Sequence, residues 1–198
     1  MRTLEEAALD ASTCTRCRLS QGRTQVVYGV GDPNADLMFI GEAPGFHEDK
    51  QGEPFVGAAG QLLNQLLGEI DVPRDDVYIN NVILCRPPGN RDPLPDELDA
   101  CKPWLDERMA IIDPAVVVTL GNWATRYILG KQVSISRVRG QRFPWSGRTV
   151  IPTFHPAAVL HGGGQASNQM TALRADFQEI RRALAERPQP AEEQLGLF

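Results

Sequence analysis

The chain has 198 residues, of which 42% are apolar, and its formal net charge is −5 at pH 7. Such a size and composition suit one compact α/β domain with a hydrophobic core. No apolar run approaches the roughly 18 to 20 residues of a membrane span, and the first residues lack the basic start and apolar segment of a signal peptide. We therefore expect neither a membrane protein nor an exported one.

The predicted elements begin with a short helix. Residues 3–6 (TLEE) have the pattern of a capping box, and the helix that they open should end before Cys14. The apolar run 37–40 predicts a buried strand that leads into a glycine-rich loop. Leucines at helical spacing indicate a helix over 58–70, and the run 77–84 predicts a second strand.

The second half of the chain continues the alternation of strands and helices. A helix that starts at a proline is predicted over 95–112, and a strand over 115–120 leads into a helix over 121–129. A further strand is predicted over 149–154 and a last amphipathic helix over 171–186. This order predicts a single α/β domain over 1–186, in which helices flank a central, mostly parallel four-stranded sheet. The Pro- and Glu-rich residues 187–198 predict a flexible C-terminal tail.

All four cysteines have positions typical of ligands. Cys14 and Cys17 form a CxxC pair, and Cys85 and Cys101 follow the second strand. In a protein without an export signal, such a set indicates a metal centre more than disulfides. Thiolate quartets hold zinc or a [4Fe–4S] cluster, and spacing separates the two poorly. Four independent buried cysteines, or a redox dithiol at the CxxC pair, are weaker alternatives because CxxC is a natural two-ligand bite and no thioredoxin-like strand precedes it.

Polar residues occur where three predicted strands end. The segment 41–57 follows the first strand, Asn81 lies in the second, and His155 follows a later one. Each has an ordinary structural explanation: Asn81 could satisfy backbone groups, His155 could be a structural hydrogen-bond former, and Phe55 could belong to the core. Ligands of parallel sheets bind beyond the carboxyl ends of the strands, so we expect these residues to share one crevice.

Three motifs carry a family resemblance. GEAPGxxEDxxGxPFVGxAGxLL at 41–63, YINNVILCRPPGNRDPLPDE at 78–97 and FHPAAVL at 154–160, together with the cysteine spacing, resemble the family 4 (iron–sulfur) uracil-DNA glycosylases. The chain lacks the Lys/Arg-rich insert with a histidine that marks a related branch which bonds covalently to DNA. The resemblance implies a uracil-DNA glycosylase-like fold, a [4Fe–4S] cluster rather than zinc, and hydrolysis of the deoxyuridine N-glycosidic bond in DNA, which leaves an abasic site.

The resemblance also implies roles for individual residues. His155 donates to uracil O2, Glu42 activates the attacking water, and Asp49 is a second carboxylate that could do so. Phe55 stacks on the flipped base, and the Asn81 amide reads uracil O4 and N3–H, a pattern that cytosine reverses. Glu48 could exclude the thymine methyl, since position 43 is alanine, or could simply cap the loop. The expected uracil-binding set is Gly41, Glu42, Ala43, Glu48, Phe55, Asn81 and His155.

Contacts to DNA are expected outside the pocket. The loop 86–95 could press on the duplex, and Leu160 is a candidate minor-groove wedge. Four arginines within 137–148 could form a basic face, although a solvated arginine-rich hairpin explains them equally well. The expected DNA-binding residues are Arg86, Arg91, Arg137, Arg139 and Leu160, and the substrate is single- or double-stranded DNA that contains uracil.

The last five residues, Gln194-Leu-Gly-Leu-Phe198, resemble the QLxLF motif that docks bacterial repair proteins on the DNA sliding clamp. Alternatively, their apolar side chains fold back onto the last helix. With the clamp motif, the sequence predicts a monomeric, cytoplasmic and nucleoid-associated bacterial protein. The competing functional interpretations are a non-catalytic Fe–S or zinc DNA-binding module, which would not need Glu42, Asn81 and His155 together, and a small-nucleotide hydrolase, for which no phosphate loop is present.

Overall fold

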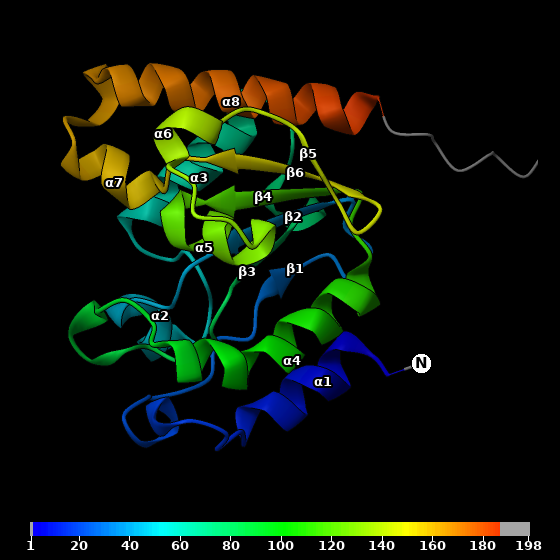
Figure 1. Ribbon diagram of the computed structural model, residues 1–198, viewed down its shortest axis with the longest axis vertical. Coiled ribbons are helices and arrows are strands. Elements are labelled where there is room, and N and C mark those ends of the chain that lie inside the picture. The colour runs from blue at the N-terminus through cyan, green and yellow to red at the C-terminus, as the bar shows by residue number, and fades with distance from the viewer. Residues whose placement is uncertain (1, 187–198) are drawn as a thin grey trace, which may run out of the picture.

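A computed structural model describes residues 2–186, which form a three-layer α/β arrangement around one sheet (Figure 1). The six-stranded sheet has the order β1-β3-β2-β4-β6-β5. The strands are β1 (Val30–Gly31), β2 (Leu37–Gly41), β3 (Tyr78–Asn81), β4 (Val116–Leu120), β5 (Phe143–Trp145) and β6 (Arg148–Thr153).

The four inner strands are parallel, and the two edge strands are antiparallel to their neighbours. The expected parallel four-stranded sheet is therefore confirmed at the centre, and the count of four is corrected to six. The edge strands β1 and β5 have two and three residues, too few to show a period of two. Residues 187–198, including the expected tail and its clamp-like motif, lie outside the described residues.

The second predicted strand is shorter than expected. It ends at Asn81, because the next two residues hydrogen-bond to the loop after β2 instead of continuing a strand. The Val82 and Ile83 amides donate to the carbonyl oxygens of Gly41 and Glu42, at 2.9 and 3.3 Å. Residues 82–84 are all buried. The apolar run that predicted the end of a strand therefore forms a buried loop beside the end of β2.

The helices include every one that the sequence predicts and three short ones that it does not. They are α1 (Leu4–Ser12), α2 (Phe46–Gln51), α3 (Ala58–Glu69), α4 (Pro95–Ile112), α5 (Gly121–Leu129), α6 (Ile135–Val138), α7 (Pro156–His161) and α8 (Asn168–Ala185). The Thr3 capping box opens α1 as predicted. The unpredicted helices α2, α6 and α7 have four to six residues, too few to display helical periodicity.

Two hydrophobic cores lie on opposite faces of the sheet. Residues of α3, α7 and α8 pack with Leu37, Phe39 and Ile79 on one face. Residues of α1, α4 and α5 pack with Met38, Ile40 and other strand residues on the other face. Figure 1 shows α8 along one side of the sheet and α1 with α4 along the other. Successive strand residues alternate between the two cores, as a doubly covered parallel sheet requires.

Between residues 2 and 186, no helix combines the length and apolar character that crossing a bilayer requires.

Strand order determines where a ligand can bind. The connection from β2 leads to β3 on one side, whereas β4 and β6 lie on the other side of β2. At such a switch point the loops beyond the strand ends diverge and leave a crevice. The segments at this edge are the loop after Gly41, the end of β3 at Asn81 and His155 after β6.

Candidate active site

A pocket of about 490 Å³ lies at the carboxyl edge of the sheet. Its wall contains six of the seven predicted uracil-binding residues: Glu42, Ala43, Glu48, Phe55, Asn81 and His155. The seventh, Gly41, lies against two of them. The structure therefore brings together three segments that are far apart in the sequence.

Gly41 is required by the close approach of its neighbours. A Cβ at this position would lie 2.3 Å from Asn81 Oδ1 and 2.9 Å from the ring of Phe55. Real Cβ atoms do not approach other atoms so closely, and the buried Asn81 and Phe55 have little room to move. Glycine at the end of β2 thus allows the amide and the aromatic ring to share one side of the pocket.

Phe55 and His155 form the aromatic part of the pocket. Their ring centroids are 5.6 Å apart, with 27° between the ring planes. Phe55 has a φ of 55°, in the left-handed region that residues other than glycine seldom adopt and that is often found at functional sites. The carbonyl of Phe55 also excludes any side chain at Gly60, where a Cβ would lie 1.6 Å from it. The ring is therefore held by close backbone packing.

His155 is a neutral hydrogen-bond donor in this arrangement. It caps α7, and its Nδ1 accepts the Ala157 amide at 3.2 Å. Nδ1 then has no proton, so the neutral ring carries its proton on Nε2. Burial lowers the pKa of His155 to about 4, although the Glu48 carboxylate opposes that shift. At neutral pH the imidazole thus offers one N–H without carrying a charge.

Asn81 is only 2% exposed. Its backbone oxygen accepts a hydrogen bond from Arg108, but its side-chain amide has no hydrogen-bond partner within residues 2–186. A buried amide usually has such partners. The alternative that Asn81 serves to satisfy nearby backbone groups therefore has no support in the geometry, and the amide is available to a ligand in the pocket.

The three acidic residues of the segment 41–49, which includes the first turn of α2, have different surroundings. Glu42 faces the pocket, and burial, with a smaller contribution from Asp92, raises its pKa to about 7. Glu48 Oε1 accepts the amides of Val56 and Gly57 at 3.1 and 3.2 Å, which is the loop-capping arrangement. Asp49 is 4% exposed, lies away from the pocket wall, and accepts the Thr24 amide at 2.8 Å.

Of the predicted DNA-binding arginines, Arg91 lies in the pocket wall and Arg86 directly precedes the wall residue Pro87. Arg91 lines the wall and is held by the buried Glu97 carboxylate through two hydrogen bonds of 2.6 and 2.9 Å. Arg86 is half-buried, and its Nε–H donates to Asn90 Oδ1 at 2.6 Å. Hydrogen bonds thus fix the orientation of both guanidinium groups.

The other predicted DNA contacts are placed away from the pocket wall. Arg139 is bound to the Asp176 carboxylate and stacks over Phe154. Arg142 and Arg148 also pair with acidic residues, so carboxylates neutralise most of the expected basic face. Arg137 is exposed on α6, and Leu160 is half-buried, packed against the core that α3 and α8 form.

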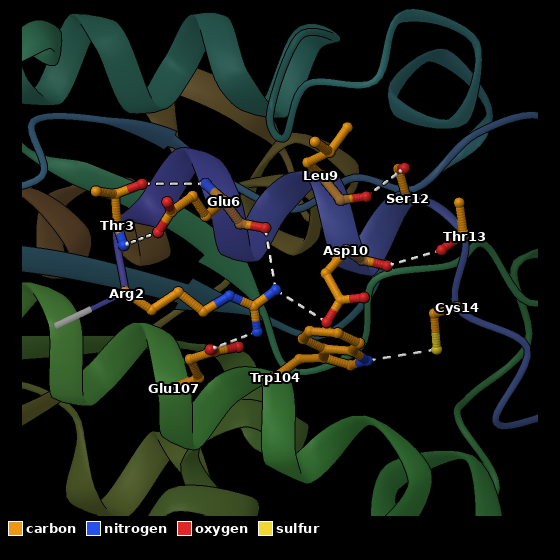
Figure 2. Close-up of polar contacts among 10 residues, drawn as sticks. All are labelled: Arg2, Thr3, Glu6, Leu9, Asp10, Ser12, Thr13, Cys14, Trp104 and Glu107. Carbon is orange, nitrogen blue, oxygen red and sulfur yellow. Dashed lines mark hydrogen bonds and ion pairs between the residues drawn. The ribbon is translucent and has the colours of Figure 1, made fainter.

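The four cysteines adjoin one core on the far side of the sheet. Trp104 Nε1–H donates to Cys14 Sγ at 3.3 Å, as Figure 2 shows, and Arg23 donates to Cys85 Sγ at 3.5 Å. Burial raises the pKa of Cys85, and the nearby thiols of Cys14 and Cys17 raise it further. Among residues 2–186, no three His, Cys, Asp or Glu side chains converge tightly enough to hold a single metal ion.

Ion pairs hold α1, which precedes the CxxC pair, against α4, which carries Cys101. Arg2 bridges Asp10 on α1 and Glu107 on α4, at 2.9 and 3.0 Å (Figure 2). These contacts are exposed and contribute little energy individually, but they fix the two helices in register. The segments that carry the cysteines are thereby held at one end of the two-helix layer.

Sequence reasoning missed several residues that the site uses. Asp92 raises the pKa of Glu42, and His161 at the end of α7 lines the pocket. Arg108 is fully buried on α4 and donates to the carbonyl oxygens of Trp104, Tyr28 and Asn81. A signal for Arg108 was available, since it falls on the same helical stripe as Cys101 and Trp104, where a charged residue needs an explanation.

Comparison with known proteins agrees with this geometry. The family model described as the uracil DNA glycosylase superfamily matches residues 28–184. Similar proteins include type-4 uracil-DNA glycosylases from Sulfurisphaera tokodaii (47% identity; 91% of this chain, 84% of the relative), Saccharolobus solfataricus (41%; 95% and 89%) and Thermotoga maritima (50%; 74% and 78%). This chain therefore belongs to the uracil-DNA glycosylase superfamily and, within it, to the type-4 enzymes.

Proposed function

We propose that this protein hydrolyses the N-glycosidic bond of deoxyuridine in DNA, releasing uracil and leaving an abasic site for base excision repair. The observation that carries the proposal is the pocket itself. An aromatic ring, an unpartnered buried amide and a neutral imidazole donor face one cavity. A base must leave the helix to reach such a pocket, because the bond to be broken is inaccessible in the stack.

Each pocket group has a role in this reaction. Phe55 stacks on the extruded ring, and the Asn81 amide pairs with uracil O4 and N3–H. The transition state separates an oxocarbenium sugar from a uracil anion, so a donor aimed at O2 lowers its energy. His155 supplies that donor from Nε2. A neutral donor suits this role, because an imidazolium ion would be costly to bury before the anion forms.

Water activation is assigned to Glu42. It lines the pocket and has a pKa of about 7, so it can accept a proton near neutral pH. Asp49, the other carboxylate considered for this step, already accepts the Thr24 amide outside the pocket wall. We therefore give Asp49 the part of holding the segment around Thr24 against the loop.

The direct test uses matched oligonucleotides that carry uracil, thymine or cytosine at one position. Incubation with the protein followed by alkaline cleavage should cut only the strand with uracil. The Asn81 amide matches O4 and N3–H of uracil but not the reversed pattern of cytosine, and we assign exclusion of the thymine methyl to Glu48 in the pocket wall. Both single- and double-stranded forms should be cut. Binding to DNA without any cleavage would instead support a non-catalytic DNA-binding module.

The cysteine set suits a [4Fe–4S] cluster held by Cys14, Cys17, Cys85 and Cys101. Thiolates are the ligands of such clusters, and N–H groups that donate to the sulfurs stabilise them. Arg23 and Trp104 already make such hydrogen bonds. The bound cluster would supply a structural link between the α1 end, the end of the buried loop 82–84 and α4. We assign it no part in the chemistry.

Iron content tests this assignment. Protein purified without oxygen should be brown, with a broad visible band and about four irons per chain, as four thiolates around a [4Fe–4S] cluster require. Cys85→Ser should lose most of that band and iron, because it removes one ligand. Colourless protein that carries one equivalent of zinc would overturn the cluster in favour of a zinc site.

We propose that DNA is held by Arg86 and Arg91 at the pocket mouth and by Arg137 farther out, with Leu160 at the edge of α7 as a wedge. Arg139 has a weaker claim, because Asp176 already binds its guanidinium. The pocket is complete within one chain, so the protein should act as a monomer. Light scattering with and without DNA checks this: a constant dimer would contradict it.

We also propose that residues 187–198 form a tail whose QLGLF ending binds the bacterial sliding clamp. Apolar anchors on an extended segment fit peptide-in-groove recognition, and tethering would raise the local concentration near replicating DNA. Deleting 194–198 should abolish clamp binding in a pull-down and leave excision on oligonucleotides unchanged. Clamp binding by the truncated protein would exclude this role for the tail.

A further inference from the structure

Two large apolar side chains are strongly exposed within residues 2–186, and one of them lies beside the pocket. Leu9 on α1 is 74% exposed, and Phe46, the first residue of α2, is 49% exposed. An exposed phenylalanine leaves apolar surface in water unless something covers it. Phe46 directly follows Gly45, which lines the pocket.

Cations surround the Phe46 ring. The guanidinium carbon of Arg86 lies 5.1 Å from the ring centroid, and Lys50 Nζ, one turn along α2, lies 5.7 Å from it. Arg86 immediately precedes Pro87, another residue of the pocket wall, and its hydrogen bond to Asn90 fixes the guanidinium. The platform formed by Phe46, Lys50 and Arg86 therefore joins two segments that both border the uracil site.

Two further arginines lie beyond the platform. A second cavity of about 420 Å³ adjoins it and is lined by Arg18, Arg86 and Arg91. Arg91 lines both the uracil pocket and this cavity, and Arg86 lines this cavity beside Pro87, which borders both. Asp96 and Glu97 pair with Arg18 and Arg91, so Arg86 and Lys50, which form no ion pair within residues 2–186, are the cations left for a phosphate. A run of cations beside an exposed aromatic ring is the combination by which proteins hold a nucleic-acid strand, with phosphates on the cations and a base on the ring.

We propose that the base next to the extruded uracil stacks on Phe46 and that the intervening phosphate binds Arg86 and Lys50. This inference rests on the proposed function and adds a flanking-nucleotide subsite to it. Stacking tolerates any base, because every base has a π-face. The subsite therefore holds the strand in register without adding a sequence preference, while the uracil pocket alone selects the base to be removed.

The first experiment changes the DNA and leaves the protein unaltered: it removes the base next to uracil. Excision by the full-length protein is measured on single strands in which the nucleotide on either side of uracil is intact or is a baseless tetrahydrofuran sugar. On one of the two sides, removing the base should lower kcat/KM by about 5- to 150-fold, the range that loss of a base–aromatic stack produces.

The test is completed by combining variants of Phe46 with the intact and the baseless strands, as in a double-mutant cycle. Phe46→Ala should lower kcat/KM by a similar factor on the intact strand and cause no further loss on the strand whose neighbour has no base. Phe46→Trp keeps a stacking ring and should restore the rate. Leu9→Ala removes the other strongly exposed apolar side chain, far from the pocket in sequence, and should behave as wild type.

Two results would overturn the subsite: an unchanged rate for Phe46→Ala on intact strands, or an equal loss with and without the neighbouring base. The second would mean that Phe46 supports the loop and does not touch DNA. If the wild-type protein releases no uracil from any strand, the proposed function itself fails, and that outcome is distinct from a failure of Phe46 alone.

Discussion

Replacing His155 with alanine should slow uracil excision by about 10² to 10³-fold in single-turnover experiments, the usual cost of losing one preorganised donor to a developing anion. The imidazole is stacked beside Phe55 and fixed through the Ala157 amide, so its Nε2–H needs no rearrangement when charge appears on uracil O2. Affinity for uracil-containing DNA should change little, because the donor gains most of its strength in the transition state.

A second histidine, His47, provides the control for this variant. His47 is exposed on α2 with its ring edge-on to Phe46, so His47→Ala should remain close to wild type. His155→Gln, which keeps a side-chain N–H, should recover part of the rate. An excision rate for His155→Ala near that of wild type, at saturating enzyme, would remove His155 from the reaction.

The parts of the fold that could be predicted are those with a clear sequence pattern. The leucines of α3 lie at helical spacing, β2 and β4 are continuous apolar runs of strand length, and α4 begins at a proline; the structure confirms all four elements. The two edge strands β1 and β5 are too short for any period to show. The prediction of strand over 82–84 was wrong for a different reason. A buried loop needs apolar residues just as a buried strand does, so the sequence does not distinguish the two.

The candidate site could likewise be predicted only in part. Parallel strands meet at one edge, so the convergence of Glu42, Asn81 and His155 follows from the strand order. The hydrogen-bond partners of each side chain do not follow from the strand order. Glu48 and Asp49 are adjacent carboxylates in the first turn of α2, yet one accepts two amides at the pocket wall and the other accepts the Thr24 amide elsewhere. Only their positions in space separate these roles.

Arg108 connects the core that contains the cysteines to the strand that carries Asn81. Its buried guanidinium donates to Trp104 on its own helix and to the carbonyl of Asn81 at 3.1 Å. Trp104 in turn donates to Cys14. A continuous series of hydrogen bonds thus runs from the thiols to the strand that presents the Asn81 amide. This buried contact links the cysteine-bearing segments to the strand that carries Asn81.

Glu42→Gln should reduce the excision rate by about 10² to 10⁴-fold and should also remove its dependence on pH. Burial and Asp92 raise the pKa of Glu42 to about 7, so the carboxyl loses its proton only as the pH rises through that value. A base must be ionised to accept a proton from water. The wild-type rate should therefore increase with pH through about 7 and level off above it.

His155 does not account for such a transition, because its pKa is lowered to about 4 and the ring is already neutral throughout that range. The measurement is a single-turnover rate across the pH range with enzyme in excess, together with DNA affinity at each pH to separate binding from chemistry. Glutamine keeps the size and hydrogen-bonding shape of Glu42 but cannot ionise, so its profile should be flat. If the wild-type rate does not change through pH 7, or if Glu42→Gln shows the same rise, another group activates the water and Glu42 has only a positional role.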